Sequence, residues 1–181
     1  ADAYPGRTVL AVDTLAASMG EGLLVYLAAQ QKKQGKSLEE VAQWVTDNRL
    51  KLSHWFTVDD LNHLKRGGRV SGAAAFFGTM LNIKPVLHVD DVGHLVPVSK
   101  TMGRKKSVLA LMKYMEQLQT LEEGDPVFIS HGDCIEDAEY LAELVKERFP
   151  GHEIRINYIG PVIGTHAGAG TLALFFKGKH R

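Results

Sequence analysis

The sequence predicts an α/β protein with a mixed, mainly antiparallel sheet of about six strands and helices packed against it. Three observations support this fold class. Short apolar or alternating segments indicate strands, segments with helical spacing separate several of them, and one tight turn joins two strands as a hairpin. We expect residues 1–53 to be the C-terminal remnant of a first α/β domain. Residues 54–181 are expected to form a complete, α+β-like second domain with helices on one face of its sheet.

Residues 1–53 are expected to contain a strand followed by two helices. The apolar run at residues 9–12 is typical of a buried parallel strand, which we predict over residues 8–13. A helix follows over residues 18–34. Ser37 and Glu40 have the spacing of a capping box, which predicts that the second helix begins there.

The remaining elements come from residues 54–181. A short helix capped by Asp59 or Asp60 is predicted to end at the Gly67–Gly68 pair, and Asp133 is predicted to cap a later helix. Residues 160–171 are expected to form a glycine-rich turn. The other predicted helices cover residues 72–83, 108–118 and 133–148, and the predicted strands cover residues 54–58, 85–90, 94–100, 125–130, 154–158 and 171–177.

Charge and cysteine content exclude several classes of function. The 181 residues include 21 Lys and Arg and 21 Asp and Glu, so there is no long-range positive field to attract nucleic acid or an anionic membrane. Cys134 is the only cysteine, which excludes an internal disulfide and a cysteine-based zinc site and fits a reducing cytoplasm. Residues 156–176 lack Lys, Arg, Asp and Glu but contain Pro161 and four glycines, so we expect no transmembrane helix there.

Residues 64–71, Leu-Lys-Arg-Gly-Gly-Arg-Val-Ser, are the first candidate for chemistry. The two glycines allow a sharp turn that can point the guanidinium of Arg69 at an anion. A helix C-cap with solvated basic side chains explains the same residues, and both interpretations stay open.

Residues 160–171 are the second candidate. His166 lies among small residues there, so a ligand can approach closely and the imidazole can donate a hydrogen bond to an acidic group. The alternative is a turn in which His166 is only a polar surface residue. The segment is not a dinucleotide fingerprint, because no helix follows with the required glycine spacing.

His131 and Asp133 could form a metal pair, or a Cys–His site with Cys134. A helix N-terminus after a strand explains the same residues more simply, and no further cluster of ligands completes a metal site. A thiol at a helix start can have a lowered pKa, but burial is the more common fate of a lone cysteine.

Two further groups of residues are candidates for surfaces. An apolar segment after the first candidate is typical of a core but would also suit the wall of a tunnel for an apolar ligand. Its large side chains are Phe76, Phe77, Met80 and Leu81. The basic run Arg104, Lys105 and Lys106 either docks an acidic partner or is a solvated helix start.

Four elements resemble motifs of the DegV family in order and spacing, and the resemblance extends over residues 9–178. They are residues 13–22 (Asp-Thr-Leu-Ala-Ala-Ser-Met-Gly-Glu-Gly), residues 64–71 followed by 73–75 and 81–87, residues 103–106, and residues 164–171. The resemblance implies two α/β domains that enclose a long-chain fatty acid. The family's N-terminal portion, with further carboxylate-binding Thr and Ser residues, is expected to be missing before residue 1.

The resemblance also implies a role as the lipid-carrier subunit of a bacterial fatty acid kinase. Catalysis then belongs to a separate kinase subunit, so we expect no enzyme activity and no cofactor in this chain. The ligand-binding residues implied by the motifs are Arg69, Thr165 and His166. Two alternatives stay open: an interaction fragment without ligand, or an independent phosphotransferase or hydrolase that uses His166 or the His131–Asp133 pair. The sequence has no nucleophile elbow, P-loop or set of metal ligands, which favours the carrier.

Overall fold

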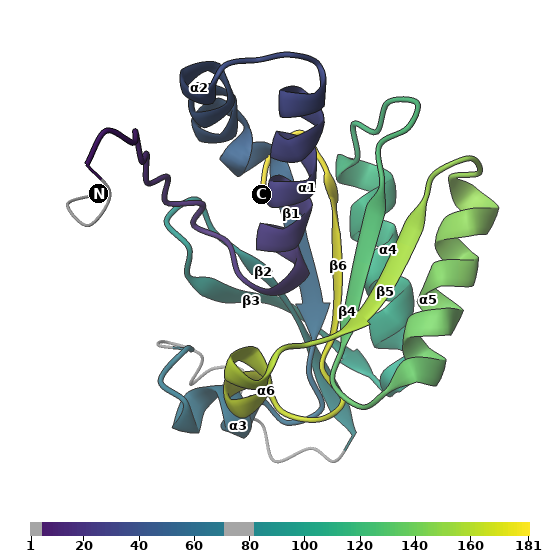
Figure 1. The fold of residues 1–181 in the computed structure, drawn as a ribbon. Coiled ribbons are helices and arrows are strands. Elements are labelled where there is room, and N and C mark those ends of the chain that lie inside the picture. The colour runs from purple at the N-terminus through teal and green to yellow at the C-terminus, as the bar shows by residue number, and fades with distance from the viewer. Residues whose placement is uncertain (1–4, 71–81) are drawn as a thin grey trace.

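The computed structural model describes residues 5–70 and 82–181 and contains a six-stranded sheet with the strand order β3-β2-β1-β6-β4-β5 (Figure 1). β4 and β5 are parallel, and the other neighbouring strands are antiparallel. This arrangement confirms the predicted α/β fold with a mixed, mainly antiparallel sheet. The strands are β1 (Leu52–Thr57), β2 (Ile83–Val89), β3 (Leu95–Met102), β4 (Val127–His131), β5 (Ile154–Tyr158) and β6 (Leu172–Lys177).

The described helices, with the exception of α6, begin and end close to the predicted positions. Ser37 and Glu40 form the expected capping box, in which each side chain accepts a hydrogen bond from the other residue's backbone N–H. Asp60 caps the next helix through the N–H of Asn62, and Gly67 ends it. The helices are α1 (Ser18–Lys33), α2 (Leu38–Asn48), α3 (Leu61–Arg66), α4 (Arg104–Leu118), α5 (Ile135–Arg148) and α6 (Pro161–Ala167), with a 3₁₀ turn at Arg49–Lys51.

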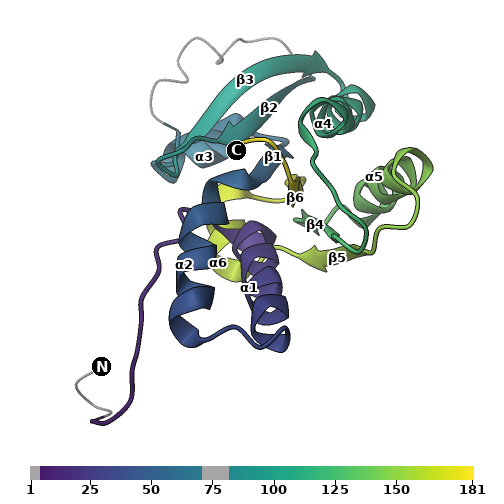
Figure 2. The same ribbon diagram turned by 90° about the horizontal axis from the view of Figure 1, so that it is seen from above.

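Helices cover both faces of the sheet (Figure 2). The helix layer expected on one face within residues 54–181 consists of α4 and α5, and α1 and α2, from residues 1–53, cover the other face. The side chains of Leu23 and Leu24 in α1 are each 1% exposed, in a core with Phe128 and Phe175 of the sheet. A sheet with apolar residues on both faces needs a helix layer on each, and residues before position 53 supply the second layer.

β2 and β3 form the predicted hairpin. The N–H of Asp90 donates to the carbonyl of His94 at 2.9 Å, and the Asp90 carboxylate accepts from the N–H groups of Val92 and His94. Gly93 has a φ of 89°, which glycine adopts without steric cost. These hydrogen bonds fix the turn between β2 and β3.

Two predicted elements are wrong. Residues 8–13 form no strand: none of the described strands pairs with them, and Val9 and Leu10 are 56% and 45% exposed. The predicted glycine-rich turn contains α6, because Pro161 occupies a first-turn position, where its fixed φ favours a helix and its missing N–H costs nothing.

The predicted cap of α5 is also wrong. Asp133 has a φ of 53° and is exposed, and Cys134 occupies the N-cap position. The backbone N–H of Cys134 donates to Nδ1 of His131 at 3.3 Å. The buried imidazole of His131 therefore takes part in the turn that starts the helix.

Two further expectations concern the apolar segment at residues 72–83 and membrane-spanning helices. The predicted helix over residues 72–83 and the proposed tunnel residues Phe76, Phe77, Met80 and Leu81 lie outside the described residues, apart from position 82 and Ile83, which begins β2. In the part of the chain that the structure describes, no helix combines the length and the apolar character needed to cross a bilayer.

Candidate functional site

A cavity of about 750 Å³ is lined by the start of α1, by β1 and β6, by the β2–β3 hairpin, and by α3 and α6 with their flanking loops. Its volume is within the roughly 300–1,000 Å³ of small-molecule sites. Most of its lining residues are apolar. They are Ala17, Phe56, Leu64, Val89, Leu95, Val96, Pro97, Ile159, Val162, Ile163, Ala167, Ala173 and Phe175. The cavity therefore suits a ligand with a long apolar part.

Arg69 and His166 line this same cavity from different segments. Arg69 follows α3 and is exposed, and its guanidinium donates to the carbonyl of Gly67 at 2.7 Å. His166 is half-buried in α6, and within the described residues its Nδ1 has no hydrogen-bond partner. The structure thus brings together a cation and an imidazole that are distant in the sequence, and both can bind an anionic group.

The third predicted ligand-binding residue, Thr165, does not line the cavity. Its hydroxyl donates to the carbonyl of Pro161 at 2.8 Å within α6, and the residue is exposed. Its carbonyl accepts a hydrogen bond from Nε2 of His63 at 2.7 Å. Thr165 thus joins α6 to α3, which lie together at one end of the sheet (Figure 1).

Gly67 permits the close approach of α3 and α6. A Cβ added to Gly67 would lie 2.8 Å from Nδ1 of His166, closer than real side-chain carbons approach. The glycine pair predicted to serve a sharp turn therefore has a second role, because the absence of a side chain leaves room for the imidazole.

His54 is a polar residue of the cavity that the sequence analysis did not single out. Its side chain is 2% exposed, and neither ring nitrogen has a hydrogen-bond partner in the described segments. The pKa of His54 is lowered from 6.5 to about 3, mainly by burial and in addition by the positive charge of Arg181 and by the neighbouring His88. The imidazole is therefore neutral. His54 lies two residues before Phe56 and therefore on the same face of the strand, which is the feature of the sequence that indicates its place near an apolar site.

Ser18 and Ser130 contribute a hydroxyl pair to the cavity, which the sequence analysis also missed. Their Oγ atoms lie 3.1 Å apart, and Ser130 is fully buried. Ser18, at the start of α1, has a φ of 56°, an uncommon conformation for a residue other than glycine. Because each hydroxyl carries one proton and two lone pairs, the pair retains hydrogen-bonding capacity toward a ligand.

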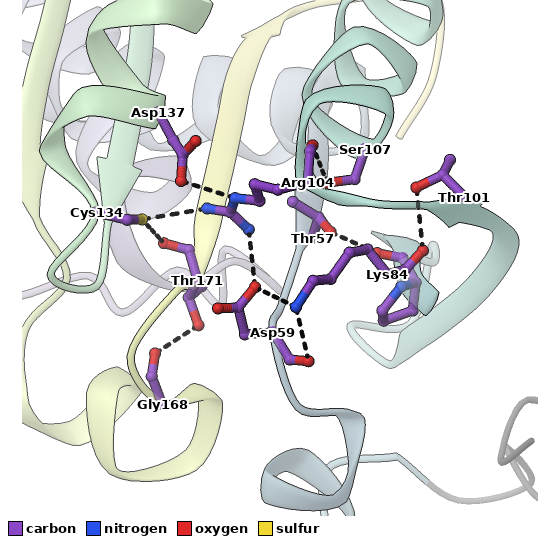
Figure 3. Close-up of polar contacts among 11 residues, drawn as sticks. Thr57, Asp59, Lys84, Thr101, Arg104, Ser107, Cys134, Asp137, Gly168 and Thr171 are labelled. Atoms are coloured by element: carbon purple, nitrogen blue, oxygen red, sulfur yellow. Dashed lines mark hydrogen bonds and ion pairs between the residues drawn. The ribbon is translucent and has the colours of Figure 1, made fainter. Parts of the chain in front are cut away.

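The basic run at the start of α4 divides between interior and surface. Lys105 and Lys106 are exposed, but the Arg104 side chain is only 19% exposed. Its Nε donates to the Asp137 carboxylate at 2.8 Å, and Nη1 forms an ion pair with Asp59 at 3.7 Å (Figure 3). Arg104 is therefore held by two carboxylates, whereas the two lysines that follow it are exposed.

Cys134 and the His131–Asp133 pair do not form a reactive or metal-binding site. Cys134 is buried, and burial raises the pKa of its thiol against the opposing effect of Arg104. His131 is buried against the ring of Tyr158, while Asp133 is exposed. Among the residues that the structure describes, no three His, Cys, Asp or Glu side chains are grouped to hold a metal ion.

Comparison with known proteins matches this chain to one family. The family model described as "Uncharacterised protein, DegV family" matches residues 1–179. A DegV domain-containing protein of Clostridium perfringens is 53% identical over 175 residues, which cover 97% of this chain and 60% of that protein. The chain spans about 60% of the length of the curated relatives it matches.

Two solved structures share the fold. A DegV family protein from Thermus thermophilus, described as binding fatty acid, is 34% identical with a TM-score of 0.84, and the match covers 96% of this chain and 62% of that one. The Streptococcus pneumoniae fatty acid kinase (Fak) B3 protein, loaded with linoleic acid, is 25% identical with a TM-score of 0.85, and the match covers 97% and 62%.

Proposed function

The chain belongs to the DegV family, and on this premise we propose that its cavity binds a long-chain fatty acid with the carboxylate toward Arg69 and His166. The observation that carries the proposal is the lining of one cavity: an apolar interior and two groups that can bind a carboxylate. Fatty acids bound to relatives of the same fold support the choice of ligand.

The apolar tail supplies most of the expected affinity. Burial of about 14 methylenes at about 0.8 kcal/mol each corresponds to about 11 kcal/mol before the entropy cost of binding. A carboxylate is costly to remove from water unless it is paired. The guanidinium of Arg69 and the imidazole of His166 offset that cost, and they determine which end of the ligand faces outward.

We further propose that the protein acts as a carrier, which presents the carboxylate to a separate cytoplasmic kinase for acyl-phosphate formation. Support comes from the Streptococcus pneumoniae relative, whose description assigns it to a fatty acid kinase. The proposed docking residues for that partner are Arg104, Lys105 and Lys106 at the start of α4, of which the two lysines are exposed. In this proposal residues 1–53 complete a first domain and residues 54–181 form the second, and the chain itself catalyses no reaction.

The proposal is tested by titrating the purified protein with a long-chain fatty acid and with its methyl ester. Both ligands have the same tail, but only the acid carries the charge that Arg69 and His166 recognise. We expect the acid to bind at least about 10-fold more tightly, because a charge-assisted hydrogen bond contributes roughly 1.5–3 kcal/mol. Equal affinities would contradict the head-group assignment, and no binding of either ligand would contradict the function.

A further inference from the structure

We propose that Arg104 is a positioning residue for the carboxylate-binding pair: through Asp59 and Cys134 it fixes the two segments that carry Arg69 and His166. This inference rests on the proposed function for its link to fatty acid. It assigns to Arg104 a role inside the protein, in addition to the docking role proposed for the basic run at the start of α4.

The guanidinium of Arg104 contacts two separate segments: the start of α5, with Cys134 at its N-cap and Asp137 in its first turn, and the loop before α3. Nε donates to the Asp137 carboxylate in α5 at 2.8 Å, and Nη2 donates to Sγ of Cys134 at 3.2 Å. Nη1 lies 3.7 Å from Oδ1 of Asp59, in the loop between β1 and α3. Figure 3 shows these groups converging on Arg104. Because a guanidinium is planar and has five donors, it can hold several partners in one fixed geometry.

Asp59 links the network to α3. It directly precedes Asp60, the residue that caps this helix. Its carboxylate also pairs with Lys84 at 2.8 Å, and the side chain of Lys84 is only 16% exposed. The two cations therefore fix the loop from which α3, and after it Arg69, continue.

Asp59 also contacts the loop between α6 and β6. A Cβ added to Gly170 would lie 2.5 Å from the carboxyl group of Asp59, and Gly170 has a φ of 75°. Only a glycine fits at this close contact. Asp59 thus connects the loop before α3 with the loop after α6.

Cys134 provides a second connection from Arg104 to α6. Its thiol donates to the carbonyl of Thr171 at 3.3 Å, and the Thr171 hydroxyl donates to the carbonyl of Gly168 at 2.7 Å. Gly168 is the C-cap of α6, two residues after His166, and Thr171 itself lines the cavity. A change in the Arg104 guanidinium is therefore transmitted to the helix that carries the imidazole.

Removal of the Arg104 charge leaves a half-buried Asp137 without this partner and Asp59 with Lys84 alone. The side chains of Asp137 and Asp59 are 33% and 49% exposed, so without the guanidinium they and the segments that carry them are free to turn toward water. The head-group pair then loses its alignment while the apolar wall of the cavity, which Arg104 does not line, is retained. The affinity for the fatty acid should therefore fall more than the affinity for its methyl ester, which has the same tail without the charge.

The test compares Arg104→Gln with Lys113→Gln, an exposed lysine in the same helix. Affinities for a long-chain fatty acid and its methyl ester are measured for each, together with the imidazole NMR signals of His166 and His63 in the ligand-free protein. We expect Arg104→Gln to lower the preference for acid over ester by about 10-fold and to shift the His166 signals. Lys113→Gln is expected to change neither. Asp59→Asn, which keeps the side-chain shape, provides a second variant if Arg104→Gln does not fold.

An unchanged ratio of acid to ester affinity in a folded Arg104→Gln or Asp59→Asn variant would overturn the inference. An equal loss for both ligands would also overturn it, because Arg104 would then shape the cavity as a whole. If the wild-type protein showed no preference for the acid, the proposed function would fail instead. In that case unshifted His166 signals would still refute the structural link, and shifted signals would support it.

Discussion

Replacement of Arg69 by alanine is expected to weaken binding of a long-chain fatty acid by about 10- to 100-fold, because a hydrogen bond to a charged group contributes roughly 1.5–3 kcal/mol. The melting temperature should stay unchanged. Arg69 is exposed, and its guanidinium donates to the Gly67 carbonyl within the same turn, so the fold depends little on it. Titration with fatty acid and thermal unfolding of the same preparation measure the two quantities.

Arg66→Ala is the matched control for this variant. Arg66 ends α3, is exposed, and forms a 3.6 Å ion pair with Asp60, but it does not line the cavity. Its removal changes the net charge by the same amount, and we expect the fatty-acid affinity to be retained. An equal loss in both variants would indicate a general effect of positive charge, and an unchanged affinity in Arg69→Ala would contradict the role of its guanidinium.

His54 is expected to make the protein sensitive to acid. Its pKa is lowered from 6.5 to about 3 in the folded protein, so the unfolded chain takes up a proton first as the pH falls below 6.5. The stability that the neutral imidazole contributes is therefore complete above pH 6.5 and is lost progressively toward pH 3. Between pH 7 and pH 5 the free energy of unfolding should fall by about 2 kcal/mol through this group. Urea denaturation at a series of pH values measures the change.

His54→Phe separates this contribution from other titrating groups. Phenylalanine retains a ring beside Phe175 and leaves no unpaired nitrogen in the core, so we expect the variant to be at least as stable at pH 7. Its loss of stability between pH 7 and pH 5 should be smaller than that of the wild type by about 2 kcal/mol. Replacement of the exposed His94 by glutamine serves as control, and the same acid dependence in wild type and His54→Phe would refute the assignment.

Local patterns predicted most of the fold because the relevant interactions are short in sequence. The capping box at Ser37 and Glu40, the Asp60 cap and the hairpin turn are formed within a few residues. Strands were recognised from alternation of apolar and polar residues. The family motifs named Arg69 and His166, which the structure brings to one cavity.

Several of the errors in the sequence analysis depend on contacts that are distant in sequence. A strand needs a neighbouring strand to pair with, and residues 8–13 have none among the described segments. In the sequence Arg104 is one of three consecutive bases, and its carboxylate partners in α5 and in the β1–α3 loop are identified only by the structure. In the sequence His54 is an ordinary strand residue, and its burial comes from α1, in which Gly20 lies against the imidazole. No local pattern reports such packing.

Native mass spectrometry of the purified protein, incubated with an excess of a long-chain fatty acid, tests whether the cavity binds this ligand. We expect a complex of one fatty acid per chain, which persists after the unbound lipid is removed. Protein that emerges without lipid, or that carries a distribution of several weakly attached molecules, would contradict a single cavity built for this ligand.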